Sequence, residues 1–320
     1  MVLEQQPAKK ENGQMLAARN LTRRFGNLLA VDDISFEVEP GTVLGFLGPN
    51  GAGKSTTMKM LTGFLSPSSG TAEVFGHDIR SDSVAARRLI GYLPEGAPLY
   101  GELTVSQLLD FIADARGFSG AERDRRIADA AARLELAGVM QQTVETLSKG
   151  FKRRVGLAQA ILHDPPVLIL DEPTDGLDPN QKQQVRHLIR EMAPDKIIVI
   201  STHILEEVDA LCSRAMIIAN GRLLADDTPA GLLTRSRYHN AVTLHVDDPE
   251  RAASRLGRLE EAREVEVRNA RVTVFPSEHG NLFQAVSRVI EEEGWTVQQL
   301  QYEPGRLDEV FRSITREEAA

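Results

Sequence analysis

The sequence has a single cysteine, no long apolar run and no excess of positive charge. Cys212 is the lone cysteine, which excludes a disulfide within the chain, and its apolar neighbours at helical spacing indicate a buried structural thiol. The longest apolar runs, such as residues 167–170 and 197–200, have the length of strands and fall far short of a membrane span. Residues 1–14 contain no apolar region of a signal peptide. We therefore expect a soluble cytoplasmic protein.

Net charge and chain length limit the kinds of partner and the number of domains to expect. The formal net charge of −9 gives no reason to expect a general nucleic-acid partner. A chain of 320 residues with 42% apolar residues is long enough for two domains, each with its own core. Residues 1–14 are polar and offer nothing to bury, so we expect them to be disordered.

The first two thirds of the chain alternate between strand-sized apolar runs and helical periodicity. Over residues 15–230 this pattern predicts an α/β fold, a parallel sheet flanked by helices, with buried strands at 43–47, 167–170 and 197–200. Residues 104–137 contain helical patterns alone, beginning at a capping box of Thr104 and Gln107. The sequence therefore predicts a helical subdomain inserted in an α/β core.

Beyond residue 240 the pattern predicts a second, smaller domain. The expected elements are a strand, a helix, a hairpin turning at Asn269-Ala270, a helix, a strand and a last helix, at residues 242–246, 249–259, 264–274, about 280–292, 296–301 and about 307–315. The order β-α-β-β-α-β is that of a ferredoxin-like α+β unit. We place the boundary in the polar stretch 234–240, which gives domains over 15–235 and 240–320.

A glycine-rich loop follows the first buried strand and precedes a helical pattern. Its sequence, GPNGAGKST, fits the phosphate-binding pattern G-x-x-x-x-G-K-[ST] in the required strand–loop–helix setting. Lys54 can reach the terminal phosphates of a nucleotide, and the Ser55 hydroxyl can bind Mg²⁺. The predicted loop consists of Gly48, Pro49, Asn50, Gly51, Ala52, Gly53, Lys54, Ser55 and Thr56.

Acidic and histidine side chains follow the other two buried strands. VLILDEP places Asp171 and Glu172 at a strand end, where Asp171 can join a magnesium shell and Glu172 can take a proton from an attacking water. His203, in STHILEE, follows the next strand and should emerge at the same sheet edge. A lone histidine there is more often structural, but three matching strand ends favour a function.

The order of these motifs resembles the ABC ATPase family. LSKGF at 147–151 looks like the family signature, and it lies upstream of LILDEPTDGLDP and STH. The resemblance implies a P-loop NTPase (RecA-like) core with a helical subdomain at about 96–155, and ATP with Mg²⁺ as cofactors. It implies that Phe25 stacks on adenine, that Glu95 in the lid approaches the metal and takes part in catalysis, and that Asp178 and His203 contact nucleotide.

The same resemblance implies a head-to-tail homodimer. ATP would lie between the phosphate loop of one copy and Ser148 and Gly150 of the other. The helix start at 146–160 fits this: Phe151, Val155 and two further apolar residues form a stripe that seats it on the core, and we expect Ser148 and Gly150 at its exposed N-terminus.

Three positions depart from the commonest family pattern. Lys149 and Phe151 replace a glycine and a glutamine in the signature, and Glu95 replaces a glutamine in the lid. A carboxylate at position 95 can approach a metal but cannot donate a hydrogen bond unless it is protonated. Whether Lys149 helps or slows turnover stays open from the sequence.

Two longer segments resemble those in the ATP-binding subunits of bacterial exporters of the gliding-motility and daunorubicin-resistance types. They are GYLPE-x-x-PLY-x-ELTV and LSKGF-x-x-RVGLAQA. This implies a subunit at the inner face of the cell membrane that drives a permease on a separate chain. The segment 95–102 and the helical subdomain would receive the permease, and Leu99 and Tyr100 fit either docking or internal packing.

Two other classes of protein fit the sequence less well. A non-transport ABC protein acting on nucleic acid or ribosomes is disfavoured by the acidic charge, by the single motif set and by the absence of room for a coiled coil. A P-loop GTPase or small-molecule kinase lacks support because no Asn-Lys-x-Asp motif is present and neither class explains LSKGF.

Overall fold

The computed structural model describes residues 15–278 and 280–317. It divides into two compact units, Met1–Asp226 and Asp227–Ala320. The expectation of disorder at residues 1–14 falls outside the described residues.

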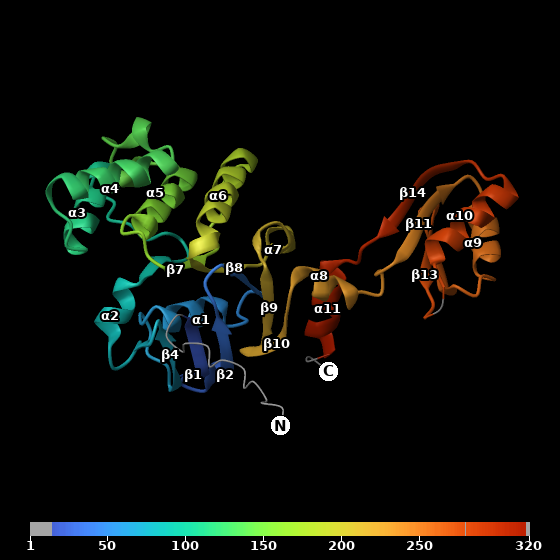
Figure 1. The fold of residues 1–320 in the computed structure, drawn as a ribbon, viewed down its shortest axis with the longest axis horizontal. Coiled ribbons are helices and arrows are strands. Elements are labelled where there is room, and N and C mark those ends of the chain that lie inside the picture. The colour runs from blue at the N-terminus through green and yellow to red at the C-terminus, as the bar shows by residue number, and fades with distance from the viewer. Residues whose placement is uncertain (1–14, 279, 318–320) are drawn as a thin grey trace, which may run out of the picture. The chain divides into compact units, whose positions relative to one another are not determined.

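A six-stranded sheet forms the centre of the first unit, in the order β10-β9-β3-β8-β7-β6. Strands β7, β8, β9 and β10 of this sheet are labelled in Figure 1. Its strands are β3 (Val43–Leu47), β6 (Ile90–Leu93), β7 (Val167–Asp171), β8 (Ile197–Thr202), β9 (Arg214–Ala219) and β10 (Arg222–Asp227). The pairs β6–β7, β7–β8, β3–β8 and β3–β9 are parallel, and every residue of β3, β7 and β8 is buried. Burial on both faces explains why these strands are continuous apolar runs. The three predicted strands are confirmed.

The N-terminal part adds a second, antiparallel sheet that the sequence analysis did not predict. Its order is β2-β1-β4-β5, with β1 (Leu16–Phe25), β2 (Leu28–Val38), β4 (Ser69–Val74) and β5 (His77–Asp78). Helix α1 (Lys54–Leu61) contacts β1, β2 and β4 of this sheet as well as β7 and β8 of the parallel sheet. The phosphate loop therefore enters a helix that is packed between two sheets.

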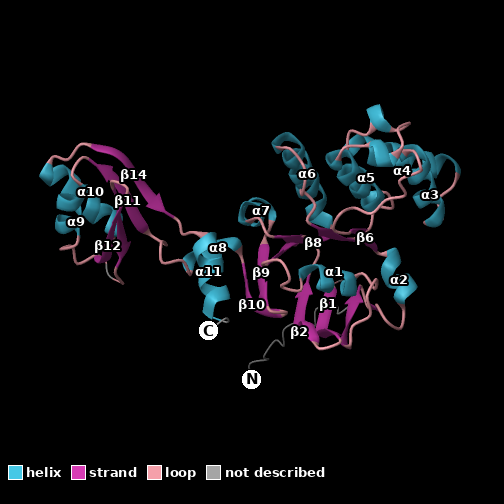
Figure 2. Cartoon of the chain, turned by 180° about the vertical axis from the view of Figure 1, so that it is seen from behind, coloured by secondary structure: helices cyan, strands magenta, loops and turns pink. Residues whose placement is uncertain are grey.

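The predicted helical subdomain is present. Helices α3 (Val105–Ala115), α4 (Gly120–Arg133) and α5 (Lys149–Ile161) gather in one group (Figure 2), and they share an apolar core with one face of the parallel sheet. The capping box is confirmed: Thr104 Oγ1 accepts from Gln107 N, and Gln107 Oε1 accepts from Thr104 N. Helices α2 (Ser83–Arg88), α6 (Pro179–Met192) and α7 (Leu205–Leu211) complete this unit, with short 3-10 turns at Ala137–Val139, Val144–Thr146 and Ala193–Asp195.

The second unit has the predicted order β-α-β-β-α-β. It comprises β11 (Ala241–Val246), α9 (Pro249–Leu256), β12 (Ala262–Arg268), β13 (Arg271–Pro276), α10 (Leu282–Glu293) and β14 (Val297–Glu303). The sheet order β12-β13-β11-β14 and the helices packed on it give a ferredoxin-like unit. Asn269 and Ala270 both have positive φ (50° and 62°) between the paired residues Arg268 and Arg271, so the hairpin turns where predicted.

The division between the units lies earlier in the chain than the predicted boundary. Helix α8 (Pro229–Thr234) contacts α11 (Leu307–Glu317) near the end of the chain and belongs with the second unit. Sequence patterns could not assign it, because the contact joins segments about seventy residues apart.

The single thiol, that of Cys212, packs against the sheet, and the residue is partly buried. Cys212 Sγ would lie 2.7 Å from a Cβ placed at Gly45, so this glycine gives the sulfur its space against β3. Burial, with a smaller contribution from Glu207, raises the pKa of Cys212 to about 12.

His163 is held neutral at the end of α5. Its Nε2 donates to the carbonyl oxygen of Ile90 at 3.1 Å, and its Nδ1 is buried without a partner among the described residues. Burial, followed by the nearby charge of Arg116, lowers the pKa of His163 to about 4, with a further contribution from Arg126. Asp164 and the Ile90 hydrogen bond act in the opposite direction.

This pKa predicts a loss of stability on mild acidification. The unfolded chain binds a proton at His163 below its ordinary pKa of 6.5 that the folded protein does not bind, so the free energy of unfolding falls as pH drops from about 6.5 toward 4. Between pH 6.5 and 5 the loss is about 2 kcal/mol at most. His163→Gln, which keeps a donor for Ile90, should reduce the drop in melting temperature between pH 7 and 5. An equal drop in both proteins would contradict the assignment.

Candidate functional site

Four neighbouring parallel strands end at one edge of the central sheet, and the predicted site residues follow those ends. The phosphate loop follows β3, Glu172 follows β7, His203 follows β8, and Glu95 comes soon after β6. Because the strands are parallel neighbours, their carboxyl ends meet at the same edge, which is where open α/β sheets bind ligands.

The phosphate loop is shaped by glycines wedged against other backbone segments. A Cβ at Gly48 would lie 2.4 Å from the carbonyl oxygen of Ile218, and one at Gly53 would lie 2.6 Å from that of Ala30. Gly53 also has φ of 102°, a conformation that favours glycine, directly before α1. Substitution at either position therefore requires the loop to move.

Lys54 lies inside this loop with 6% of its surface exposed. Its Nζ donates to the carbonyl oxygens of Gly48 at 2.7 Å and Pro49 at 3.1 Å. Burial lowers the pKa of Lys54, while Glu172, Asp171 and Glu95 favour the charged form and oppose that shift. The ammonium is thus positioned among loop carbonyls and three carboxylates.

Asp171 is completely buried at the end of β7, and only one of its two carboxylate oxygens has a hydrogen-bond partner among the described residues. Ser201 Oγ, from β8, donates to Asp171 Oδ1. Asp171 Oδ2 is buried without a hydrogen-bond partner among the described residues. A buried carboxylate oxygen without a donor is costly unless a cation or an ordered water satisfies it, so the site fits a metal at this oxygen.

Glu172 and His203 form a pair across β7 and β8. His203 Nδ1 donates to Glu172 Oε1 at 2.8 Å, with the histidine about half exposed and the glutamate largely covered. Glu172 has φ of 51°, in the left-handed region that non-glycine residues rarely adopt. Its backbone N–H is directed at the Ser201 carbonyl and hydroxyl oxygens, at 3.1 and 3.2 Å.

Glu95 approaches the loop from β6. Its Oε2 lies 3.5 Å from Ser55 Oγ, which donates to it. Ser55 and Glu95, both predicted as metal ligands, are therefore adjacent. Among the described residues no group of three or more His, Cys, Asp or Glu side chains forms a metal cage. Mg²⁺ bound with substrate phosphates needs only one or two protein carboxylates, so the residues present fit it.

A hollow of about 360 Å³ lies at this edge of the sheet. It is lined by Phe25, Leu28, Ala30, Asn50, Gly51, Gly53, Lys54, Ser55, Thr56, Glu95 and Glu172. All of these except Leu28 and Ala30 are predicted site residues. The guanidinium carbon of Arg23 lies over the Phe25 ring, 4.6 Å from its centroid, and Phe25 remains 44% exposed. Leu28 and Ala30 gave no signal in the sequence because they lie on the unpredicted strand β2.

The signature residues do not line this hollow. Ser148 is exposed and caps α5, its Oγ accepting from Phe151 N at 3.3 Å. The expectation that Gly150 is exposed is wrong: it is buried, and a Cβ there would lie 2.6 Å from Gln181 Oε1. Asp178 caps α6, accepting from Gln181 N at 2.9 Å, so Gln181 occupies the space beside Gly150.

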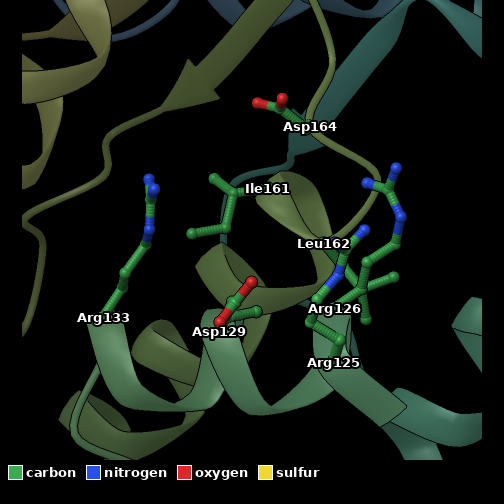
Figure 3. Close-up of a pocket in the computed structure, with 8 residues that line it drawn as sticks. Arg125, Arg126, Asp129, Arg133, Ile161, Leu162 and Asp164 are labelled. Atoms are coloured by element: carbon green, nitrogen blue, oxygen red, sulfur yellow. The ribbon is translucent and has the colours of Figure 1, made fainter. Parts of the chain in front are cut away.

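A charged hollow of about 220 Å³ lies elsewhere, on the helical subdomain (Figure 3). Arg125, Asp129 and Arg133 extend from successive turns of α4, and Ile161 and Asp164 come from the end of α5 and the segment after it. Asp164 is paired with Lys196 at 2.6 Å. None of the predicted site residues lines this hollow.

Comparisons with known proteins agree with the motif order. The family model for the ABC transporter domain matches residues 31–175. The probable multidrug ABC transporter ATP-binding protein YbhF of Escherichia coli is 37% identical over 223 residues, which cover 69% of this chain and 38% of that protein. This chain thus spans well under half the length of that relative.

A relative of similar length also matches. The Nod factor export ATP-binding protein I of Burkholderia lata is 33% identical over 305 residues, covering 94% of this chain and 96% of that protein. A solved structure of an ATP-binding subunit of an ABC transporter is 32% identical with a TM-score of 0.65, covering 69% of this chain and 93% of the other.

The charge of Lys149 is already neutralised within the chain. Its Nζ donates to Asp175 Oδ2 at 2.9 Å, its stem covers Gly176, and this bond is the main reason why the pKa of Asp175 is lowered. Both side chains are substantially exposed, so the pair contributes at most about 1 kcal/mol.

Given the ATP hydrolysis that the motif order predicts, Lys149→Met should change turnover by no more than about fivefold, the rate equivalent of such a pair. Phosphate release at saturating ATP measures it, and Asp175→Asn serves as the matched variant that removes the other partner. A much larger loss in Lys149→Met alone would show that the ammonium contacts nucleotide.

Proposed function

Because this chain belongs to the ABC transporter family, we propose that it binds and hydrolyses ATP at the carboxyl edge of its parallel sheet and powers a separate membrane permease. The hollow described above carries this proposal. It brings an exposed aromatic ring, the phosphate loop, Glu95 and Glu172 to one place, although these residues are up to about 150 positions apart in the chain.

The chain's own residues divide the work of phosphoryl transfer. Lys54 and the loop amides hold the terminal phosphates. Glu172 accepts a proton from the attacking water, and His203 Nδ1 holds the carboxylate in place through Oε1. Phe25 presents an exposed ring to the adenine base.

Ser55, Glu95 and Asp171 would hold Mg²⁺. The unpartnered Asp171 Oδ2 and the contact between Ser55 and Glu95 support this set. When bound, the ion neutralises charge on the phosphates.

A second copy would complete the site. Ser148 is exposed at the N-terminus of a 13-residue helix and does not line this chain's own hollow. The start of such a helix favours an anion. We assign Ser148 to the nucleotide held by the phosphate loop of the partner copy. Gly150, which is buried, leaves space for Gln181, and we assign Asp178 to the same junction because it caps the helix that supplies Gln181.

Two observations support a membrane permease as the partner: the names of the relatives and an exposed aromatic surface. No helix in the described ranges has the length and apolar character needed to cross a bilayer. Tyr100, near the lid, and Phe111, on α3, are both exposed and pack edge to face at 5.6 Å. We propose that this aromatic pair docks the permease at the inner face of the membrane, that transport is export, and that residues 240–320 form an accessory domain.

Loss of the catalytic base should separate binding from hydrolysis. Glu172→Gln removes the proton acceptor but keeps the size of the side chain, so ATP hydrolysis should fall at least about 100-fold while ATP affinity is retained. Glu191→Gln, exposed on α6 and paired within the described residues with His187 alone, is the control. Phosphate release and binding of a fluorescent ATP analogue measure the two effects. Equal turnover in both variants would remove Glu172 from this role.

The docking proposal is tested by co-expressing this chain with a multi-span hydrophobic protein found in a neighbouring reading frame. Tyr100→Asp places a charge in the aromatic pair and should abolish copurification of that protein while ATPase activity persists. Phe64→Asp, at an exposed aromatic outside the helical subdomain, should leave copurification intact. A stable complex with the Tyr100 variant would refute the assignment of this surface.

A further inference from the structure

Arg153 is a buried arginine whose guanidinium is held by backbone carbonyls alone. It lies on α5, five residues after Ser148, and only 4% of its surface is exposed. Its Nη2 donates to the carbonyl oxygens of Asp171 and Glu172, its Nη1 to that of Pro94 at 3.1 Å, and its Nε to that of Pro173 at 3.4 Å. No carboxylate lies within ion-pair distance of it in the described part of the chain.

These carbonyls belong to the two strand ends that carry Glu95 and Glu172. The β6–β7 ladder stops at the pair Leu93–Leu170. Pro94 has no N–H, so the ladder cannot continue through it. Arg153 inserts where the next ladder bonds would be, and its fan of N–H donors joins the end of β6 to the end of β7.

Glu172 in particular needs such support. Its φ of 51° is unfavourable for a residue with a side chain and persists only where neighbouring groups hold it. Ser201 holds its backbone N–H from β8, and Arg153 holds its carbonyl from α5. This backbone conformation places the Cβ of Glu172, and its carboxylate accepts a hydrogen bond from His203.

The charge environment is consistent with a guanidinium at this position. Burial lowers the pKa of Arg153, while Asp175, Asp171, Glu172 and Glu95 favour its charged form. A lysine keeps the charge but offers three donors on one nitrogen, which cannot reach carbonyls spread over both strand ends.

We propose that Arg153 is a positioning residue for ATP hydrolysis: it links the helix that begins at Ser148 to the backbone of Glu172 and to Pro94 beside Glu95, and so sets the direction of the catalytic carboxylate. The inference rests on the proposed ATPase activity. It assigns no contact between Arg153 and the nucleotide, so Arg153 should affect turnover and not affinity.

Arg154 provides a matched control. It is the next residue of the same helix and is 6% exposed. It donates to the Leu134 carbonyl oxygen at 3.1 Å, lies 3.6 Å from Glu135 and stacks on Phe151, all within the signature helix and its neighbouring helical segment. It touches none of the strand ends that carry the site.

The experiment compares Arg153→Lys and Arg154→Lys in the full chain, with kcat, affinity for a fluorescent ATP analogue and melting temperature as readouts. Arg153→Lys should lower kcat by at least about 10-fold, a loss on the scale of a sub-ångström to 1 Å misplacement of a catalytic group, with ATP affinity within about threefold of wild type. Arg154→Lys should keep kcat within about threefold of wild type, even if its melting temperature falls as far as that of Arg153→Lys. In a Glu172→Gln background, Arg153→Lys should lower kcat less than about twofold further, because it acts through Glu172.

Several results would overturn the inference. The first is an unchanged kcat in Arg153→Lys, and the second is an equal loss of kcat in Arg154→Lys. The third is that Arg153→Lys lowers kcat by the same factor in the wild-type chain and in the Glu172→Gln background. Loss of ATP affinity in both Arg153→Lys and Arg153→Gln would also overturn it, since the residue would then serve folding in general. A wild-type chain that hydrolyses no ATP would instead refute the proposed function itself.

Discussion

The parallel pairing of β3, β8, β7 and β6 is the constraint on which the rest of the structure depends. It forces four strand ends to one edge and so brings together the phosphate loop, Glu172, His203 and Glu95 from four separate parts of the chain. The pairing is stabilised by continuous apolar strands buried between two layers, and this is also why polar side chains appear only where each strand ends. Packing and chemistry are therefore encoded in the same short segments.

Beyond the strand ends, the site depends on polar groups that satisfy one another with one conspicuous exception. Ser201 supplies a donor to Asp171, His203 supplies one to Glu172, and loop carbonyls surround Lys54. Asp171 Oδ2 is the buried oxygen in this set that no described residue satisfies. That pattern suits a site whose remaining partners arrive with nucleotide and metal.

Much of this was predictable from local sequence. The loop motif, the three buried strands, the capping box at Thr104 and the hairpin turn at Asn269-Ala270 each depend on neighbouring residues or on burial of a whole strand. What could not be predicted depends on distant packing. The burial of Gly150 requires Gln181 of another helix, and α8 joins the second unit through a helix at the far end of the chain. Arg153 reads as one charge in a basic run, yet its carbonyl partners lie up to about sixty residues away. The antiparallel sheet gives no clear signal in the sequence because β1 and β2 contain several charged residues.

We propose that each nucleotide site is built from the phosphate loop of one copy and the helix start at Ser148 of another. Mixing two inactive chains tests it most directly: Lys54→Ala has a defective loop and an intact α5 start, and Ser148→Arg has the reverse. In an equal mixture, half of the dimers would contain one chain of each kind. Each such dimer has one complete site and one defective site. The mixture should therefore regain about a quarter of wild-type ATP hydrolysis. A mixture as inactive as either chain alone would contradict the account.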